Sequence, residues 1–147
     1  MNCKNVEDCK KELTKSKLTL QDKKGGKSKF LINNKSESKF AIIDFEECVY
    51  KNKENDTKCD FGLIANQSIF FIELKGSDVS KGFKQLLQTI NETEKCFIGL
   101  KKKSRLIVSK YSKPNLAKKS KAYKDLIKKL GNTERLIVKQ NLYQEII

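Results

Sequence analysis

The sequence contains no histidine. This absence excludes the Ser-His and Cys-His pairs that activate nucleophiles in many hydrolases. Any general-base chemistry must therefore come from carboxylates, lysine or metal-bound water. The five cysteines are odd in number, irregularly spaced and without a C-x-x-C pair, so we expect reduced, partly buried thiols rather than a zinc site or a disulfide framework. The cysteines are Cys3, Cys9, Cys48, Cys59 and Cys96.

Long apolar runs are also missing. No stretch of about 18 apolar residues occurs, so we expect no membrane-spanning helix. The first residues, MNCKNVEDCKKEL, lack the apolar centre of a signal peptide, and we expect a cytoplasmic protein. The 147 residues show no internal repeat or low-complexity segment, which predicts one domain over residues 1–147.

Positive charge is abundant and unevenly distributed. The formal net charge is +14, from 32 basic and 18 acidic residues. Between Lys95 and Lys129 there are 13 Lys or Arg residues and a single acid, Asp125. Such a one-sided region suits a polyanion, because neutralised phosphates release their counterions. Nucleic acid is therefore the first expectation, and an anionic membrane surface is the weaker second.

The most informative stretch is KCDFGLIANQSIFFIELKG, residues 58–76, which predicts two apolar strands joined by a tight turn. Side chains alternate along a strand, so Glu73 and Lys75 share one face. A turn closed on residues 66–67 places Asp60 directly opposite Glu73, and a four-residue loop keeps the same register. Opposed Cβ atoms lie about 4.5–5.5 Å apart. At that distance, two carboxylates can hold one divalent cation, with an ammonium group beside them.

This pattern resembles the PD-(D/E)XK nuclease superfamily, whose fold is restriction-endonuclease-like. Asp60 matches the first acid, and Glu73 and Lys75 match the E-x-K motif, while Cys59 replaces the usual proline. The resemblance implies that Asp60 and Glu73 bind Mg²⁺ or Mn²⁺, with the Leu74 carbonyl as a further ligand. It also implies that Lys75 positions the attacking water or stabilises developing charge.

The resemblance extends from about residue 41 to residue 90 and brings in further candidates. Gln85 matches a glutamine that members related to RecB often place on the following helix, facing the active site or the DNA. Asp44 follows an apolar strand that should neighbour Asp60. It either assists metal binding or caps a strand end in water, and Glu46 is a weaker candidate for the same metal site.

The expected elements combine helices and strands. They are a helix over residues 4–15, strands over 30–32 and 40–45, the hairpin, a helix over 79–94, a strand over 105–108, a helix over 116–130 and a strand over 135–138. This order predicts an α/β fold with a mixed central sheet flanked by helices. The resemblance implies the core order α-β-β-β-α-β. The glycine- and lysine-rich loop 21–28 is either a flap over a nucleic-acid groove or a plain connection, which is the simpler reading, and residues 51–57 form a polar turn.

The functional expectation is a Mg²⁺-dependent nuclease that hydrolyses phosphodiester bonds of DNA. The alternative is a catalytically silent nucleic-acid-binding module or subunit that keeps the nuclease fold, and a basic interaction protein that binds no nucleic acid is a third reading. A homodimer or a partner protein is compatible with either of the first two readings. The residues expected to bind nucleic acid are Lys81, Lys84, Lys101, Lys102, Lys103, Arg105, Lys118, Lys119 and Lys121.

Overall fold

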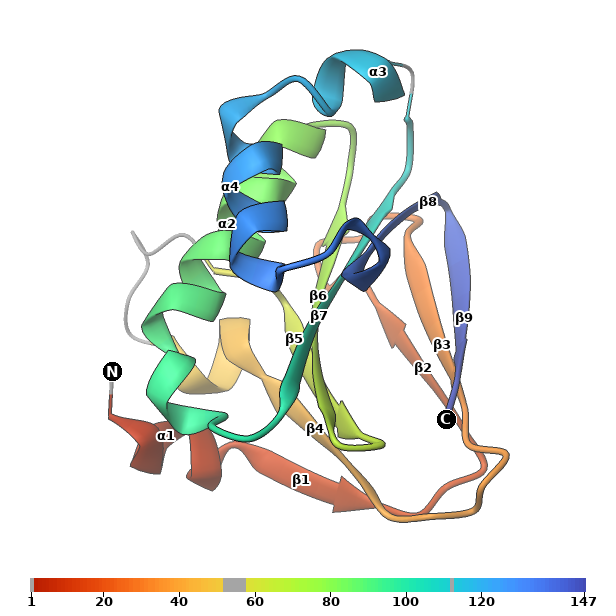
Figure 1. Ribbon diagram of the computed structural model, residues 1–147. Helices are drawn as coiled ribbons and strands as arrows, with labels where there is room; N and C mark the ends of the chain where they lie inside the picture. Colours follow the sequence, from red (N-terminus) through yellow and green to blue (C-terminus); the bar gives the residue numbers. More distant parts are fainter. Residues whose placement is uncertain (1, 52–57, 112) are drawn as a thin grey trace.

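A six-stranded mixed sheet forms the centre of the protein, as seen in a computed structural model that describes residues 2–51, 58–111 and 113–147 (Figure 1). The strand order is β1-β4-β5-β6-β7-β8. The strands are β1 (Lys10–Leu13), β4 (Phe40–Asp44), β5 (Phe61–Ala65), β6 (Ser68–Lys75), β7 (Lys101–Val108) and β8 (Leu136–Gln140). The first four pair antiparallel, whereas β6, β7 and β8 run parallel to one another. The expected α/β class is confirmed.

Helices cover one face of this sheet (Figure 1). Asp78 caps α2 (Val79–Glu92) by accepting a hydrogen bond from the Lys81 N–H, and the apolar stripe of α2 is buried, as the sequence predicts. The second long helix, α4 (Lys121–Leu130), ends at Gly131, whose φ of +88° suits glycine. The two helices pack on the β6 side chains Ile69 and Phe71 in one apolar core.

A second sheet, which the sequence analysis did not anticipate, covers the other face (Figure 1). Its strands are β2 (Lys17–Gln21), β3 (Lys29–Asn33) and β9 (Leu142–Ile146), in the order β2-β3-β9. Phe30 and Ile32 of β3 pack against Phe70 and Ile72 of β6 in a separate core. Helices therefore flank the central sheet on one side only. The chain's last residues, expected as a packed extension, form a strand that pairs in parallel with β3.

The N-terminal prediction of one helix over residues 4–15 was wrong. Helix α1 spans only Cys3–Asp8, and the chain continues as β1, which pairs antiparallel with β4. The apolar positions of this segment are sparse, and pairing with the edge of the sheet outweighs its weak helical periodicity. None of the helices within residues 2–51, 58–111 and 113–147 has the length and apolar character needed to cross a membrane.

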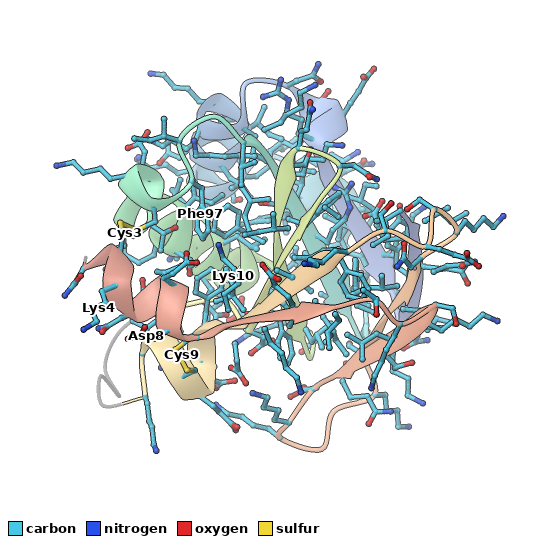
Figure 2. All side chains as sticks on the ribbon, turned by 90° about the horizontal axis from the view of Figure 1, so that it is seen from below. Cys3, Lys4, Asp8, Cys9, Lys10 and Phe97 are labelled. Carbon is cyan, nitrogen blue, oxygen red and sulfur yellow. A yellow bond between two sulfur atoms is a disulfide. The ribbon has the colours of Figure 1, made fainter. Side chains whose placement is uncertain are left out.

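The expectation of five reduced thiols was also wrong. Two disulfides join the ends of α1 to the rest of the chain, Cys3 to Cys96 and Cys9 to Cys48, whereas Cys59 is free and buried (Figure 2). The bonded residues are 93 and 39 positions apart, yet their Cα atoms lie 5.3 and 5.8 Å apart. These Cα distances are typical of disulfides. Sequence spacing gives no sign of this proximity, because tertiary packing creates it.

Three short helices also differ from expectation. The residues after the strand expected over 40–45, for which a continued strand or a bulge was open, form a π-helical turn, η1 (Phe45–Val49). Turns of 3₁₀ helix occur at η2 (Glu94–Cys96) and η3 (Thr133–Arg135). The helix expected over residues 116–130 is divided into α3 (Pro114–Ala117) and α4, with Ser120 as the N-cap of α4. Leu116, whose spacing in the helix expected over 116–130 predicts an inward side chain, is 63% exposed. Except for Lys51, the polar turn expected over residues 51–57 lies outside the described residues.

Candidate functional site

The β5–β6 hairpin has the register that the sequence predicts. Ala65 lies opposite Ser68 and Phe61 opposite Ile72, so the turn contains only residues 66 and 67. Both turn residues have positive φ, 52° and 61°, as a tight two-residue hairpin turn requires. The paired register ends at Phe61 and Ile72; just before β5, the Asp60 N–H donates to the Ile72 carbonyl at 3.1 Å, and the Leu74 N–H donates to Asp60 Oδ2 at 2.8 Å. The hairpin therefore brings Asp60 and Glu73 together at the end of the central sheet.

Both carboxylates are withdrawn from water. Glu73 is 2% exposed, and its Oε1 is buried without a hydrogen-bond partner. Asp60 is partly buried, and its Oδ2 accepts a hydrogen bond of 2.8 Å from the Leu74 N–H. An unpaired buried carboxylate oxygen is costly. Glu73 Oε1 is thus available to a cation or to a proton.

Burial and neighbouring carboxylates disfavour the charged forms of both acids. Burial, together with the neighbouring carboxylates of Glu46 and Asp22, raises the pKa of Asp60 to about 7, despite the opposing Leu74 hydrogen bond. Burial and the charge of Asp60 raise the pKa of Glu73 well above its usual range, while the positive charge of Lys75 acts in the opposite direction. Two neighbouring acids with raised pKa values share the site, and a nearby positive charge would favour their ionised forms.

These residues line a small polar pocket of about 180 Å³ at the end of the sheet. The lining residues are Asp22, Lys24, Glu46, Asp60, Glu73, Leu74, Lys75, Gly76 and Gln85. The pocket therefore contains the predicted catalytic residues Asp60, Glu73, Lys75 and Gln85. Within residues 2–51, 58–111 and 113–147, no group of three or more His, Cys, Asp or Glu side chains has metal-binding geometry. The acids at the pocket are thus arranged as one close pair, Asp60 and Glu73, with Glu46 and Asp22 around it.

Gln85 reaches this pocket from the first half of α2. Its Nε2 donates to the Lys58 carbonyl at 3.1 Å, whereas its Oε1 is buried without a partner. Gln85 thus adds a second unpaired oxygen to the same pocket as Glu73. Leu74 contributes differently, because its side chain packs in the core between the two sheets and its N–H is bonded to Asp60.

Glu46 lines the pocket, whereas Asp44, the stronger candidate from the sequence, does not. The Asp44 carboxylate contacts Lys23 and accepts from the Glu47 N–H at 2.9 Å, as the N-cap of η1. Asp44 is not among the residues that line the pocket, and it caps the start of η1 rather than a strand end in water. Glu46 lines the pocket because the chain turns helically after β4. Its Oε1 lies 3.6 Å from Lys24 Nζ.

The loop between β2 and β3 also belongs to the site, although the sequence analysis preferred to read it as a plain connection. Asp22 and Lys24 line the pocket, and the Ser28 Oγ donates to the Lys75 carbonyl at 3.0 Å. In the sequence, the sign that this loop could belong to the site was the combination of an acid and several lysines around two glycines. Only the second sheet, which was not predicted, places this loop over the end of the hairpin.

The predicted nucleic-acid-binding residues do not form one surface. Arg105 is 4% exposed, and its Nε donates to Glu145 at 2.6 Å, so it is an internal residue. Lys101 lies opposite Ser68 and Val108 opposite Lys75, which places Lys101 seven residues, roughly 23 Å, from the pocket end. Lys102 and Lys103 lie beside Lys101 at that far end. The remaining predicted residues are exposed on α2 and around α3 and α4: Lys81, Lys84, Lys118, Lys119 and Lys121.

Comparison of this chain with protein-family models, with curated proteins and with solved structures found no match. The function must therefore be argued from the site itself.

Proposed function

We propose that the protein is a divalent-metal-dependent nuclease that hydrolyses phosphodiester bonds of DNA. The observation that carries the proposal is the placement of Asp60 and Glu73 side by side at the end of the hairpin, with Glu73 Oε1 unpaired and Lys75 at the same pocket. The order of β4, β5, β6, α2 and β7 is also that of the last five elements of the core that the resemblance implies, whereas three strands separate α1 from β4.

The residues at the pocket fit Mg²⁺ or Mn²⁺. Every candidate ligand is an oxygen, which suits a hard divalent cation, and the pocket contains no thiol or imidazole. Asp60 and Glu73 would hold the cation, with the Leu74 carbonyl as the further ligand that the resemblance implies. When bound, the cation lowers the pKa of a coordinated water and offsets charge on the phosphate.

The chain's own residues would supply positioning and charge. In hydrolysis, the water oxygen bonds to phosphorus, one ester P–O bond breaks and the departing oxygen takes up a proton. Lys75 would orient the water or stabilise the negative charge that develops on the phosphate oxygens. Gln85, with its unpaired Oε1, would accept a hydrogen bond from the water and hold its orientation. The exposed lysines of α2 and of the α3–α4 region would bind the flanking phosphates.

A cleavage assay tests the proposal. Supercoiled plasmid, linear duplex, branched DNA and single strands are incubated with Mg²⁺, with Mn²⁺ or with EDTA. We expect metal-dependent cutting that falls at least 100-fold in Asp60→Asn and Lys75→Ala. Lys17→Ala, an exposed lysine of β2 that does not line the pocket, is the matched control and should cut normally.

Cleavage by Asp60→Asn or Lys75→Ala at the wild-type rate would refute the assignment. Absence of cutting by folded protein that still binds DNA would favour the catalytically silent module instead.

A further inference from the structure

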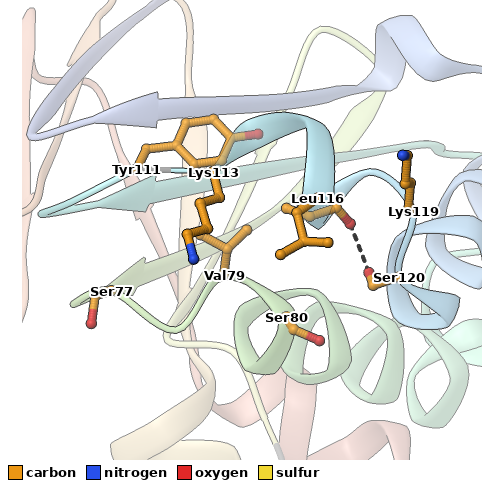
Figure 3. Close-up of a pocket in the computed structure, with 9 residues that line it drawn as sticks. Ser77, Val79, Ser80, Tyr111, Lys113, Leu116, Lys119 and Ser120 are labelled. Atoms are coloured by element: carbon orange, nitrogen blue, oxygen red, sulfur yellow. Dashed lines mark hydrogen bonds between the residues drawn. The ribbon is translucent and has the colours of Figure 1, made fainter.

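A second hollow adjoins the acidic pocket at the same end of the sheet. It has a volume of about 440 Å³ and lies between the start of α2 and the segment around α3 (Figure 3). The two depressions are contiguous along the chain, since Gly76 lines the acidic pocket and Ser77 lines the hollow. A strand that reached both depressions would place a phosphate at the acidic pocket and a neighbouring nucleotide at the hollow.

The hollow combines an apolar wall with a cationic rim. Val79, Leu116 and the Tyr111 ring provide the apolar part, and Lys113 and Lys119 supply positive charge (Figure 3). None of the described residues that line the hollow is acidic. This composition matches a ligand that has a flat apolar body joined to an anionic group.

The Leu116 side chain is exposed at the hollow and can contact such a ligand. It is 63% exposed, although it is a large apolar residue that the sequence pattern places on the inner side of a helix. The break between α3 and α4 turns it away from the core and toward the hollow, and Ser120 stabilises this break. The Ser120 Oγ donates to the Ala117 carbonyl at 2.8 Å (Figure 3). It also accepts from the Tyr123 N–H at 3.1 Å, which caps α4.

We infer that this hollow binds one unpaired base of the DNA strand, next to the phosphate held at the acidic pocket. This inference rests on the proposed function and names the substrate class as DNA with an unpaired nucleotide beside the cleavage point. A volume of about 440 Å³ belongs to the lower part of the range for small-ligand sites, about 300–1,000 Å³, and is far too small for a duplex. The base lies between Tyr111 and Leu116, and Lys113 binds the adjacent phosphate. Stacking of a base on an aromatic ring contributes about 1–3 kcal/mol and is tolerant of sequence.

The test measures binding in EDTA, so that it does not depend on cleavage. The probes are a fluorescent single-stranded oligonucleotide, the same strand with scattered abasic sites, and its blunt duplex. We expect the intact strand to bind more tightly than the abasic strand. Leu116→Ala should weaken binding of the intact strand about five-fold or more and leave duplex binding unchanged. Leu142→Ala, at a leucine of β9 that is 54% exposed, is the matched control and should bind both probes like the unaltered protein.

Equal binding of the intact and abasic strands, or no effect of Leu116→Ala on the intact strand, would overturn the inference. Either result would leave the proposed nuclease function standing if plasmid cleavage still required Lys75. Conversely, loss of base-dependent binding in Leu116→Ala would support the hollow even if cleavage were absent.

Discussion

Ionising Asp60 should destabilise the metal-free protein. The folded state raises its pKa from 3.8 to about 7. Between these values the folded state binds the proton more tightly than the unfolded state, so stability falls as pH rises through this range. A difference of about three pKa units corresponds to about 4 kcal/mol at most, at 1.36 kcal/mol per unit. For a domain of this size, that amounts to roughly 10 °C in Tm. Glu73, whose pKa is also raised, acts in the same direction.

The assay is thermal unfolding in EDTA between pH 5 and pH 8, repeated at pH 8 with Mg²⁺. The unaltered protein should lose Tm as pH rises, and Mg²⁺ should restore Tm because cation binding stabilises the folded state. Asp60→Asn removes the titrating group, so it should flatten the pH dependence and abolish most of the Mg²⁺ effect.

Asp8→Asn, at an exposed aspartate of α1, is the matched control and should behave like the unaltered protein. The reasoning would be refuted if Asp60→Asn kept the full decline of Tm with pH. It would also be refuted if the unaltered protein gained stability between pH 5 and pH 7.

Two further predictions concern the framework. Glu145→Gln leaves the buried Arg105 guanidinium without its charged partner between the two sheets, so it should cost about 3 kcal/mol in urea unfolding, whereas the exposed neighbour Gln144→Ala should cost less than about 0.5 kcal/mol. A thiol-reactive probe added to unfolded, unreduced protein should label Cys59 alone. After reduction the probe should label all five cysteines. Reduction should also lower Tm, because each disulfide contributes about 4 kcal/mol to the free energy of unfolding in the chain-entropy account of the loop that it closes. Five labelled thiols before reduction would contradict the observed pairing.

The features of the site that the sequence predicts correctly depend on residues close together in the chain. Alternation along β6 directs Phe70, Ile72 and Leu74 to the second sheet and leaves Glu73 on the helical face. The two-residue turn fixes the register as far as Phe61 and Ile72, and Asp60 and Glu73 are the next residues on the two strands. The N-cap and the stripe of α2 are equally local signals.

The features that were missed depend on distant segments. Strands β2 and β9 are too short and too polar to be recognised alone, because only one face of each is buried. They form a sheet only because β3 pairs with both, and β9 comes more than 100 residues after β3. The disulfides and the burial of Arg105 follow from the same long-range packing.

The second sheet explains how the acidic pocket acquires its remaining wall. Strands β2 and β3 cannot shift relative to the hairpin without disturbing the core that Phe30 and Ile32 share with β6. Their connecting loop is consequently held over the end of β6, where Ser28 bonds to the Lys75 carbonyl. This anchoring brings the Asp22 carboxylate to the pocket, where its charge helps to raise the pKa of Asp60. The central hairpin thus supplies the acid pair, whose burial is the main cause of its raised pKa values, and the loop of the second sheet adds the smaller effect of Asp22 on Asp60.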